Sequence, residues 1–469
     1  MRILPVLKPS PLFFKRVFVL ALPIASQNLL FSSLNMLDIF MIGQLGTDPV
    51  SSVSLANQVS FIVFLFIFGI GTGSSVFWAQ FWGAGNKKDM HAVMGIALTA
   101  GLTMSLFVSL LVFMFPGDIF SFLSPDNNVR KLGADYLKWM WPTYPFTAVS
   151  LIYAIALRST GNARLPFLIS SLSLLINTVG NYILIFGKIG FPAMGVEGAA
   201  IATLIARATE AFLTVFFVYA RKTAFAAPLK NLFSASTHLI KDYIKKVWPV
   251  VTNELGWSLG MSAYQVIFAR VSTDMVAANT LAGTLINFAV VFFVGSSNAC
   301  GVMIGNALGA HRTKRAKSYA KAFAVWAFLL GVFFGLLLIL ASDIFSRLFN
   351  ISTNARYLLR VYIILFGCFM GFKIFNWHTV VGIFRSGGDT SFCMLMELGS
   401  VWLIGVPLVF LSALIWDLSF FWIIFLMQTE ELVKFFIGLW RFVSGKWIKM
   451  VGGKIITEPY EPHEQMLEP

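Results

Sequence analysis

The chain has 469 residues, of which 58% are hydrophobic and only 12% are charged, and its mean hydropathy is +0.79. Soluble globular domains carry about a quarter of their residues as charged side chains, so this composition excludes an ordinary soluble enzyme. The apolar residues come in blocks of about twenty or more, as in helices that cross a bilayer. Since one crossing takes roughly 20 to 25 residues, the length predicts about a dozen spans and no separate soluble domain.

Twelve apolar segments, bounded by Gly, Pro, Asn or charged residues, are predicted to form these spans. In chain order they cover residues 16–42, 52–82, 90–115, 132–157, 165–187, 195–220, 243–270, 276–308, 318–346, 356–384, 391–414 and 417–443. We therefore expect an all-α membrane protein with 12 transmembrane helices.

The net charge of +14 raises the question of whether the chain binds nucleic acid. Of the 35 Lys and Arg residues, 24 lie in connections or span ends on the side of the termini, seven in those of the opposite side and four farther inside spans. Lys and Arg concentrate in cytoplasmic loops of membrane proteins. The distribution therefore predicts a multi-pass protein of the inner cell membrane with both termini in the cytoplasm, and no nucleic-acid partner.

The two halves of the chain resemble each other when Pro23 is aligned with Pro249, an alignment that we call the repeat register. In this register Gly69 aligns with Gly295, Gly83-Ala84 with Gly309-Ala310 and, after one inserted residue, Arg158-Ser159 with Arg385-Ser386. Six spans per copy give both copies the same orientation, which predicts a parallel repeat of two pseudo-symmetric six-helix bundles. We predict an N-lobe at residues 1–225, a C-lobe at 226–450 and a polar cytoplasmic tail at 451–469.

Asp38 is the strongest site candidate, because a carboxylate inside a span is costly and is functional by default. Asn177 and Asn181 lie one helical turn apart on one face of the fifth span, and each offers a carbonyl oxygen. The predicted depths place Thr203 of the sixth span at the same level. One carboxylate and several neutral oxygens suit a small hard cation such as Na⁺, and the carboxylate alone could bind H⁺.

Several stretches of the chain resemble the multidrug and toxic compound extrusion (MATE) family. They are Leu22-Pro23 through Leu37-Asp38 to Gly43, Gly69 to Gly85, Leu-Arg-Ser-Thr-Gly-Asn at 157–162, Asn177 to Gly187, and Gly-Val-Glu-Gly-Ala-Ala-Ile-Ala-Thr at 195–203. The resemblance implies two six-helix lobes around a V-shaped cleft, and export of amphipathic, often cationic organic compounds driven by inward Na⁺ or H⁺. It also implies that the matching positions on helices 1, 5 and 6 form the N-lobe cation site. Some members carry Asp where this chain has Asn181, so the site has one charge less and the choice between Na⁺ and H⁺ stays open.

The second half contains a different set of polar candidates: Asn253, Glu254, Lys373 and His378. The C-lobe carboxylates that the resemblance implies for the seventh and tenth helices of some relatives are replaced here by Trp257 and Ile374. We expect Glu254 to pair with Lys373, because both lie near mid-membrane where either charge alone is costly. The alternative is that Glu254 carries protons by itself.

Other charges near or inside spans have plainer interpretations. Arg207 with Glu210 and Glu430 with Lys434 are spaced to pair on their own helices, and Glu397 is expected near water at a cytoplasmic end. The three cysteines have no zinc-ligand spacing, so we expect no cofactor and no metal beyond transported Na⁺.

The expected function is an efflux antiporter that works as a monomer on small organic molecules in the lipid bilayer. A lipid or lipid-linked oligosaccharide flippase of related architecture is the nearer alternative. A membrane-embedded lipid-modifying enzyme is more remote, because no acidic or His cluster is present for a metal or a general base. We therefore expect a transporter and not an enzyme.

Overall fold

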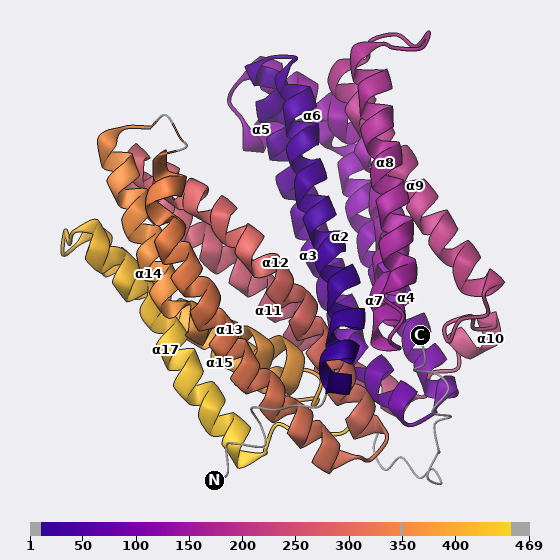
Figure 1. The fold of residues 1–469 in the computed structure, drawn as a ribbon. Helices are drawn as coiled ribbons and strands as arrows, with labels where there is room; N and C mark the ends of the chain where they lie inside the picture. Colours follow the sequence, from indigo (N-terminus) through magenta and orange to yellow (C-terminus); the bar gives the residue numbers. More distant parts are fainter. Residues whose placement is uncertain (1–10, 348, 350, 452–469) are drawn as a thin grey trace. The chain divides into compact units, whose positions relative to one another are not determined.

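The computed structural model describes residues 11–347, 349 and 351–451, apart from the side chains of residues 12, 32, 34–36 and 288. Within this part of the chain every regular element is a helix (Figure 1). In chain order they are α2 (Pro11–Gly43), α3 (Thr47–Gly83), α4 (Lys87–Met114), α5 (Pro116–Leu123), α6 (Asn127–Met140), α7 (Thr143–Ser159), α8 (Arg164–Phe186), α9 (Gly195–Ala220), α10 (Leu229–Leu232), α11 (Thr237–Val271), α12 (Thr273–Gly309), α13 (Thr313–Arg347), α14 (Thr353–Trp377), η1 (His378–Phe384), α15 (Thr390–Ser400), η2 (Val401–Gly405), α16 (Val406–Leu414) and α17 (Phe420–Ser444). The predicted tail lies outside the described residues except for Val451.

Each predicted span coincides with one helix or with a run of two or three consecutive helices. Among the described residues, nine helical segments are long and apolar enough to cross a membrane, and α6 with α7 makes a tenth as a pair bent by 53°. The bend falls at Pro142, which has no N–H for the helical ladder. The remaining two predicted spans are α11 and α17, which are 35 and 25 residues long. The predicted all-α fold class is therefore confirmed.

The repeat predicted from the sequence is present in the backbone. Helices α3 and α12 both contain 37 residues, and their first and last residues coincide in the repeat register. The turn that follows each of them has a residue with positive φ, Gly85 at 72° and His311 at 57°, at equivalent positions of the same register. Gly161 and Gly388 also have positive φ values, 92° and 85°, in the register that includes the inserted residue. Helices α3 and α12 therefore share their bounds, and two turns have the same geometry in both halves.

The helices form two compact units. We call Ser26–Trp78 together with Asn86–Ile244 the N unit, and residues up to Ala25, Ala79–Gly85 and the chain from Lys245 onward the C unit. In the N unit α8 packs along α9, α7 packs against α4 and α9, and α6 packs against α9. In the C unit α14 packs against α12, α13 and α17. The predicted lobe boundary after residue 225 stays a prediction.

Within the C unit, the ends of α3 and α12 meet at two glycines related by the repeat. A Cβ atom on Gly83 would overlap the carbonyl oxygen of Asn306, and a Cβ on Gly309 would overlap the carbonyl oxygen of Gln80. Gln80 and Asn306 are themselves equivalent in the repeat register, so the contact is symmetric. Glycine is needed at both positions because the obstacle is backbone, which cannot rotate away.

This contact predicts the effect of adding one methyl group. Gly309→Ala should destabilise the protein by about 1 to 3 kcal/mol, the usual cost of overpacking, and should lower the melting temperature in detergent. Gly83→Ala should cost a similar amount. Gly117→Ala is the matched control, since a Cβ there meets open space. A Gly309→Ala variant that melts with the control would contradict the close approach.

Candidate cation site and buried ion network

Asp38 lies in the last two turns of α2 and contacts α8 inside the N unit. Asn181 Nδ2 donates a hydrogen bond to Asp38 Oδ1 at 2.6 Å, and Asn181 is only 1% exposed. The partner of Asp38 is thus a neutral amide. Glu210, Glu254, Glu397, Glu430 and Glu431, which lie inside other long helices of the described chain, all form ion pairs.

The other two predicted residues of this site form a second contact, one turn away along α8. Asn177 Nδ2 donates to Thr203 Oγ1 on α9 at 3.2 Å. Tyr136 of α6 also lies at this place, within electrostatic range of Thr203 and Asp38. Asp38, Asn177, Asn181 and Thr203 are therefore brought together from three helices, with Tyr136 as an additional member.

The oxygen atoms of this cluster set its chemistry. Asn181 Oδ1 is buried and has no hydrogen-bond partner within the described part of the chain, although a buried acceptor normally has one. A carboxylate, amide oxygens and a hydroxyl are ligands for Na⁺. A proton on Asp38 would instead turn the carboxyl group into a donor, which the unpaired Asn181 oxygen could accept.

A separate chain of polar contacts runs through the N unit and begins on α9, one turn after Thr203. The expected pair on α9 is confirmed, with Arg207 Nη1 to Glu210 Oε2 at 2.7 Å. Three hydrogen bonds extend it across α8, α2 and α7: Ser170 Oγ to Glu210 Oε1 at 2.7 Å, Gln27 Nε2 to Ser170 Oγ at 2.8 Å, and Arg158 Nη2 to Gln27 Oε1 at 2.8 Å.

In the C unit the expected pairing of Glu254 with Lys373 is wrong. Glu254 Oε1 accepts from Arg385 Nη1 at 2.6 Å, and both side chains are largely buried, at 14% and 6% exposed. Arg385 also lies 3.7 Å from Glu397, which accepts a 2.6 Å hydrogen bond from Asn253. Glu397 therefore belongs to this cluster, and its side chain is still 20% exposed.

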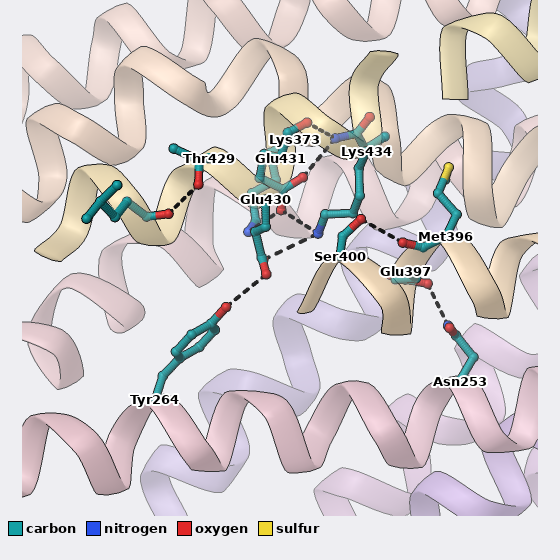
Figure 2. Close-up of polar contacts among 12 residues, drawn as sticks. Asn253, Tyr264, Lys373, Met396, Glu397, Ser400, Thr429, Glu430, Glu431 and Lys434 are labelled. Carbon is teal, nitrogen blue, oxygen red and sulfur yellow. Dashed lines mark hydrogen bonds and ion pairs between the residues drawn. The ribbon is translucent and has the colours of Figure 1, made fainter. Parts of the chain in front are cut away.

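Lys373 belongs to a second cluster, centred on α17 (Figure 2). Its ammonium lies 3.1 Å from Glu431, and Lys434 bonds both Glu431, at 3.1 Å, and Glu430, at 3.4 Å. Tyr264 donates to Glu430 at 2.8 Å. The i,i+3 spacing on α17 places Glu431 beside Lys434, and the side chain of Glu431 is only 4% exposed. Lys373 binds the same carboxylate from α14.

The backbone passes close to this second cluster at Gly405. A Cβ on Gly405 would overlap both the Tyr264 hydroxyl and the Glu430 carboxylate. Gly405 ends the π-helical turn η2, and such turns are frequent at functional sites inside helices.

His378 is not part of either ion cluster. Its ring nitrogens bond Ser296 at 2.5 Å and the carbonyl of Ile374 at 2.9 Å, and it is 1% exposed. It therefore fixes η1 against α12. The four second-half candidates are thus split among three places: Asn253 and Glu254 with Arg385, Lys373 with Glu431, and His378 with Ser296.

Two important residues were missed from the sequence. The Lys and Arg distribution counts Arg385 on the cytoplasmic side, just after the tenth predicted span, yet it is only 5% exposed. The repeat offered the signal, since Arg158 and Arg385 occupy equivalent positions and each bonds the first helix of its own half. Tyr136 gave no signal, because a tyrosine in an apolar helix more often packs or anchors at the interface.

Comparisons with known proteins agree with this architecture. A family model described as MatE matches residues 23–183 and 249–411, and the two matches begin at Pro23 and Pro249, the pair that defines the repeat register. The probable multidrug resistance protein NorM of Thermotoga maritima is 23% identical over 445 residues, 93% of each chain. The uncharacterized transporter YisQ of Bacillus subtilis is 24% identical over 452 residues, 94% of this chain and 96% of the relative.

Solved structures match the fold. The Vibrio cholerae MATE transporter VcmN, as a mutant, superimposes with a TM-score of 0.83 at 17% identity, covering 92% of this chain and 97% of the other. An outward-facing multidrug resistance MATE family transporter of the MOP superfamily gives 0.82 at 20% identity, covering 96% and 99%.

Two repeated helical bundles with a polar site buried between helices define a membrane transporter. The chain belongs to the MatE family, which confirms the resemblance to MATE transporters seen in the sequence.

The ion pairs of the C unit predict the outcome of two double-mutant cycles on thermal stability in detergent. Glu254→Gln and Arg385→Gln should each be strongly destabilising, by about 3 to 5 kcal/mol, and the double variant should cost much less than their sum. Glu254→Gln combined with Lys373→Met should instead be additive. Additivity in the first cycle, or strong coupling in the second, would contradict the observed partners.

Proposed function

We propose that this chain is a secondary active antiporter that exports amphipathic organic compounds, cationic ones among them, in exchange for Na⁺ or H⁺. The exchange proceeds by alternating access, in which the binding site opens to one side of the membrane at a time. The observation that carries this proposal is the hydrogen-bond environment of Asp38. Asp38 is a carboxylate on a spanning helix, held by a neutral amide and adjacent to an unpaired amide oxygen.

The physical argument concerns charge compensation. An ionised carboxylate without a cation costs several kcal/mol inside a span, so Asp38 gains from binding Na⁺ or a proton. Ion binding also changes the hydrogen bonds that Asp38 and Asn181 can form, because a protonated carboxyl group donates a hydrogen bond where a carboxylate only accepts. A conformation that holds the ion better is thereby favoured when the ion is present.

The organic cargo is supported by the relatives and by the family. The Thermotoga relative carries the printed name of a probable multidrug resistance protein, and extending that activity to this chain is part of the proposal. A lipid or lipid-linked oligosaccharide flippase is the alternative, and it predicts transport of a labelled lipid in place of a soluble dye. The relatives are transporters, which fits the expectation that the chain is not an enzyme.

We further propose that one chain is sufficient for transport, because Asp38, Asn181, Asn177 and Thr203 all come from the same unit of the same chain. The 24 to 7 distribution of Lys and Arg supports insertion in the inner cell membrane with both termini in the cytoplasm.

The experiment is efflux of a fluorescent lipophilic cation from proteoliposomes under an imposed Na⁺ gradient or pH gradient. One of the two gradients should drive efflux by the wild-type protein. Asp38→Asn should reduce driven efflux by roughly 100-fold or more, because each 1.4 kcal/mol of lost ion binding is a factor of ten.

Asp118→Asn is the matched control, since Asp118 is exposed at the start of α5 and far in sequence from the site. It should transport as the wild type does. Full gradient-driven efflux by Asp38→Asn would remove Asp38 from the mechanism. Movement of a labelled phospholipid without dye efflux would favour the flippase.

A further inference from the structure

Arg207 is a cation inside the N unit that the proposed coupling mechanism does not use. Its guanidinium bonds Glu210 at 2.7 Å and lies over the ring of Phe31 at 5.7 Å from the centroid. The Arg207 side chain is 30% exposed, whereas that of Glu210 is 7% exposed. The Arg207 side chain is therefore partly exposed, while its carboxylate partner is buried.

Arg207 lies one helical turn from Thr203 and about two turns from Asp38. On α9 it follows Thr203 by one turn, and on α2 its neighbour Phe31 precedes Asp38 by seven residues, about 10.5 Å along the axis. Seven residues make nearly two full turns, so Phe31 and Asp38 share one face of α2. The charge of Arg207 acts on Asp38 across this interval.

The directions of the helices bring the two side chains toward each other. Phe31 is level with Arg207, and Asp38 lies toward the Thr203 end of α9, so α2 and α9 run antiparallel. Helical side chains lean toward the N-terminus of their own helix. Asp38 therefore leans toward Arg207, and an extended Arg207 leans toward Asp38.

Glu210 keeps a compensating charge if Arg207 moves away. Arg158 interacts electrostatically with Glu210, and the two are connected through the hydrogen bonds of Gln27 and Ser170. Asp38, Glu210, Arg158 and Arg207 together carry no net charge. Moving Arg207 from one carboxylate to the other therefore leaves neither acid without a nearby cation.

We propose that Arg207 is an internal counter-ion that competes with the coupling cation for Asp38. When Na⁺ or H⁺ occupies Asp38, Arg207 pairs with Glu210, and when the cation leaves, the Arg207 guanidinium takes its place at Asp38. The exchange keeps the negative charge of Asp38 paired after the cation has left. It therefore lowers the cost of releasing the cation inside an apolar environment. This inference rests on the proposed function, because it assigns a second role at the same site.

The test is a double-mutant cycle between Asp38→Asn and Arg207→Gln, read as melting temperature in detergent under two conditions. Without Na⁺ at high pH, the two losses should be strongly non-additive, because either substitution removes the same pair. With the coupling cation at saturating concentration the losses should add. Additivity under both conditions would overturn the proposal.

Cation affinity gives a second readout. Arg207→Gln should lower the Na⁺ or H⁺ concentration for half-maximal stabilisation by about tenfold or more, because a competitor is removed, and Arg207→Lys should stay close to the wild type. Should Arg207→Gln fail to fold, Arg207→Gln with Glu210→Gln removes the pair together and must show the same gain in affinity. An unchanged or weaker affinity would also overturn the proposal.

The two proposals fail in different ways. If the proposed function is wrong, the melting temperature of the wild type does not depend on either cation, and Asp38→Asn transports normally. If only the internal counter-ion is wrong, cation binding at Asp38 persists and the cycle is additive in both conditions.

Discussion

A charged group inside a membrane-spanning helix must find its partner within the protein, because lipid offers none. The described spans follow this constraint in the C unit, where Glu254, Glu430 and Glu431 are all bound by basic residues. Asp38 differs, since its partner in the described structure is the amide of Asn181. The missing positive charge is what a transported cation would supply, and this is why the function is argued from Asp38.

The two halves share a backbone plan but differ in their polar chemistry. The bounds of α3 and α12 and the positive-φ residues of two turns coincide in the repeat register, and an arginine is kept at the same place in each half, as Arg158 and Arg385. Around Arg158 the N unit has an amide, a serine and one acid. Around Arg385 the C unit has Glu254 and Glu397, and a separate cluster joins Glu430 and Glu431 to two lysines. The repeat thus sets the geometry, and the side chains decide that the first half places the carboxylate of Asp38 beside a neutral amide.

Much of this fold could be predicted from the sequence because membrane helices are long and their apolar blocks are easily recognised. The grouping of Asp38, Asn177, Asn181 and Thr203 followed from depth, because all four were predicted at a similar level, and the structure divides them into two contacts. Depth can be counted along the chain, since every residue of a helix advances the same distance along its axis.

The partners of Glu254 could not be predicted in this way. Depth places Lys373 at the level of Glu254, but the sides on which two helices face each other depend on the rotation of each helix about its axis. Depth alone therefore does not identify Arg385 as the partner of Glu254. Lys434 was expected to pair only on its own helix, yet its neighbour Glu431 also binds Lys373 from α14. A local spacing rule identifies which groups can meet on one helix, whereas tertiary packing selects the partners across helices.

The central claim is that Asp38 is where the coupling cation binds, and the most direct test is to count bound cations. Purified wild-type protein and Asp38→Asn would be compared for bound radioactive Na⁺ and, in separate samples, for proton uptake when the pH is lowered. The account predicts that the variant binds one monovalent cation per chain fewer than the wild type in one of the two measurements. Equal binding by both proteins in both measurements would contradict it.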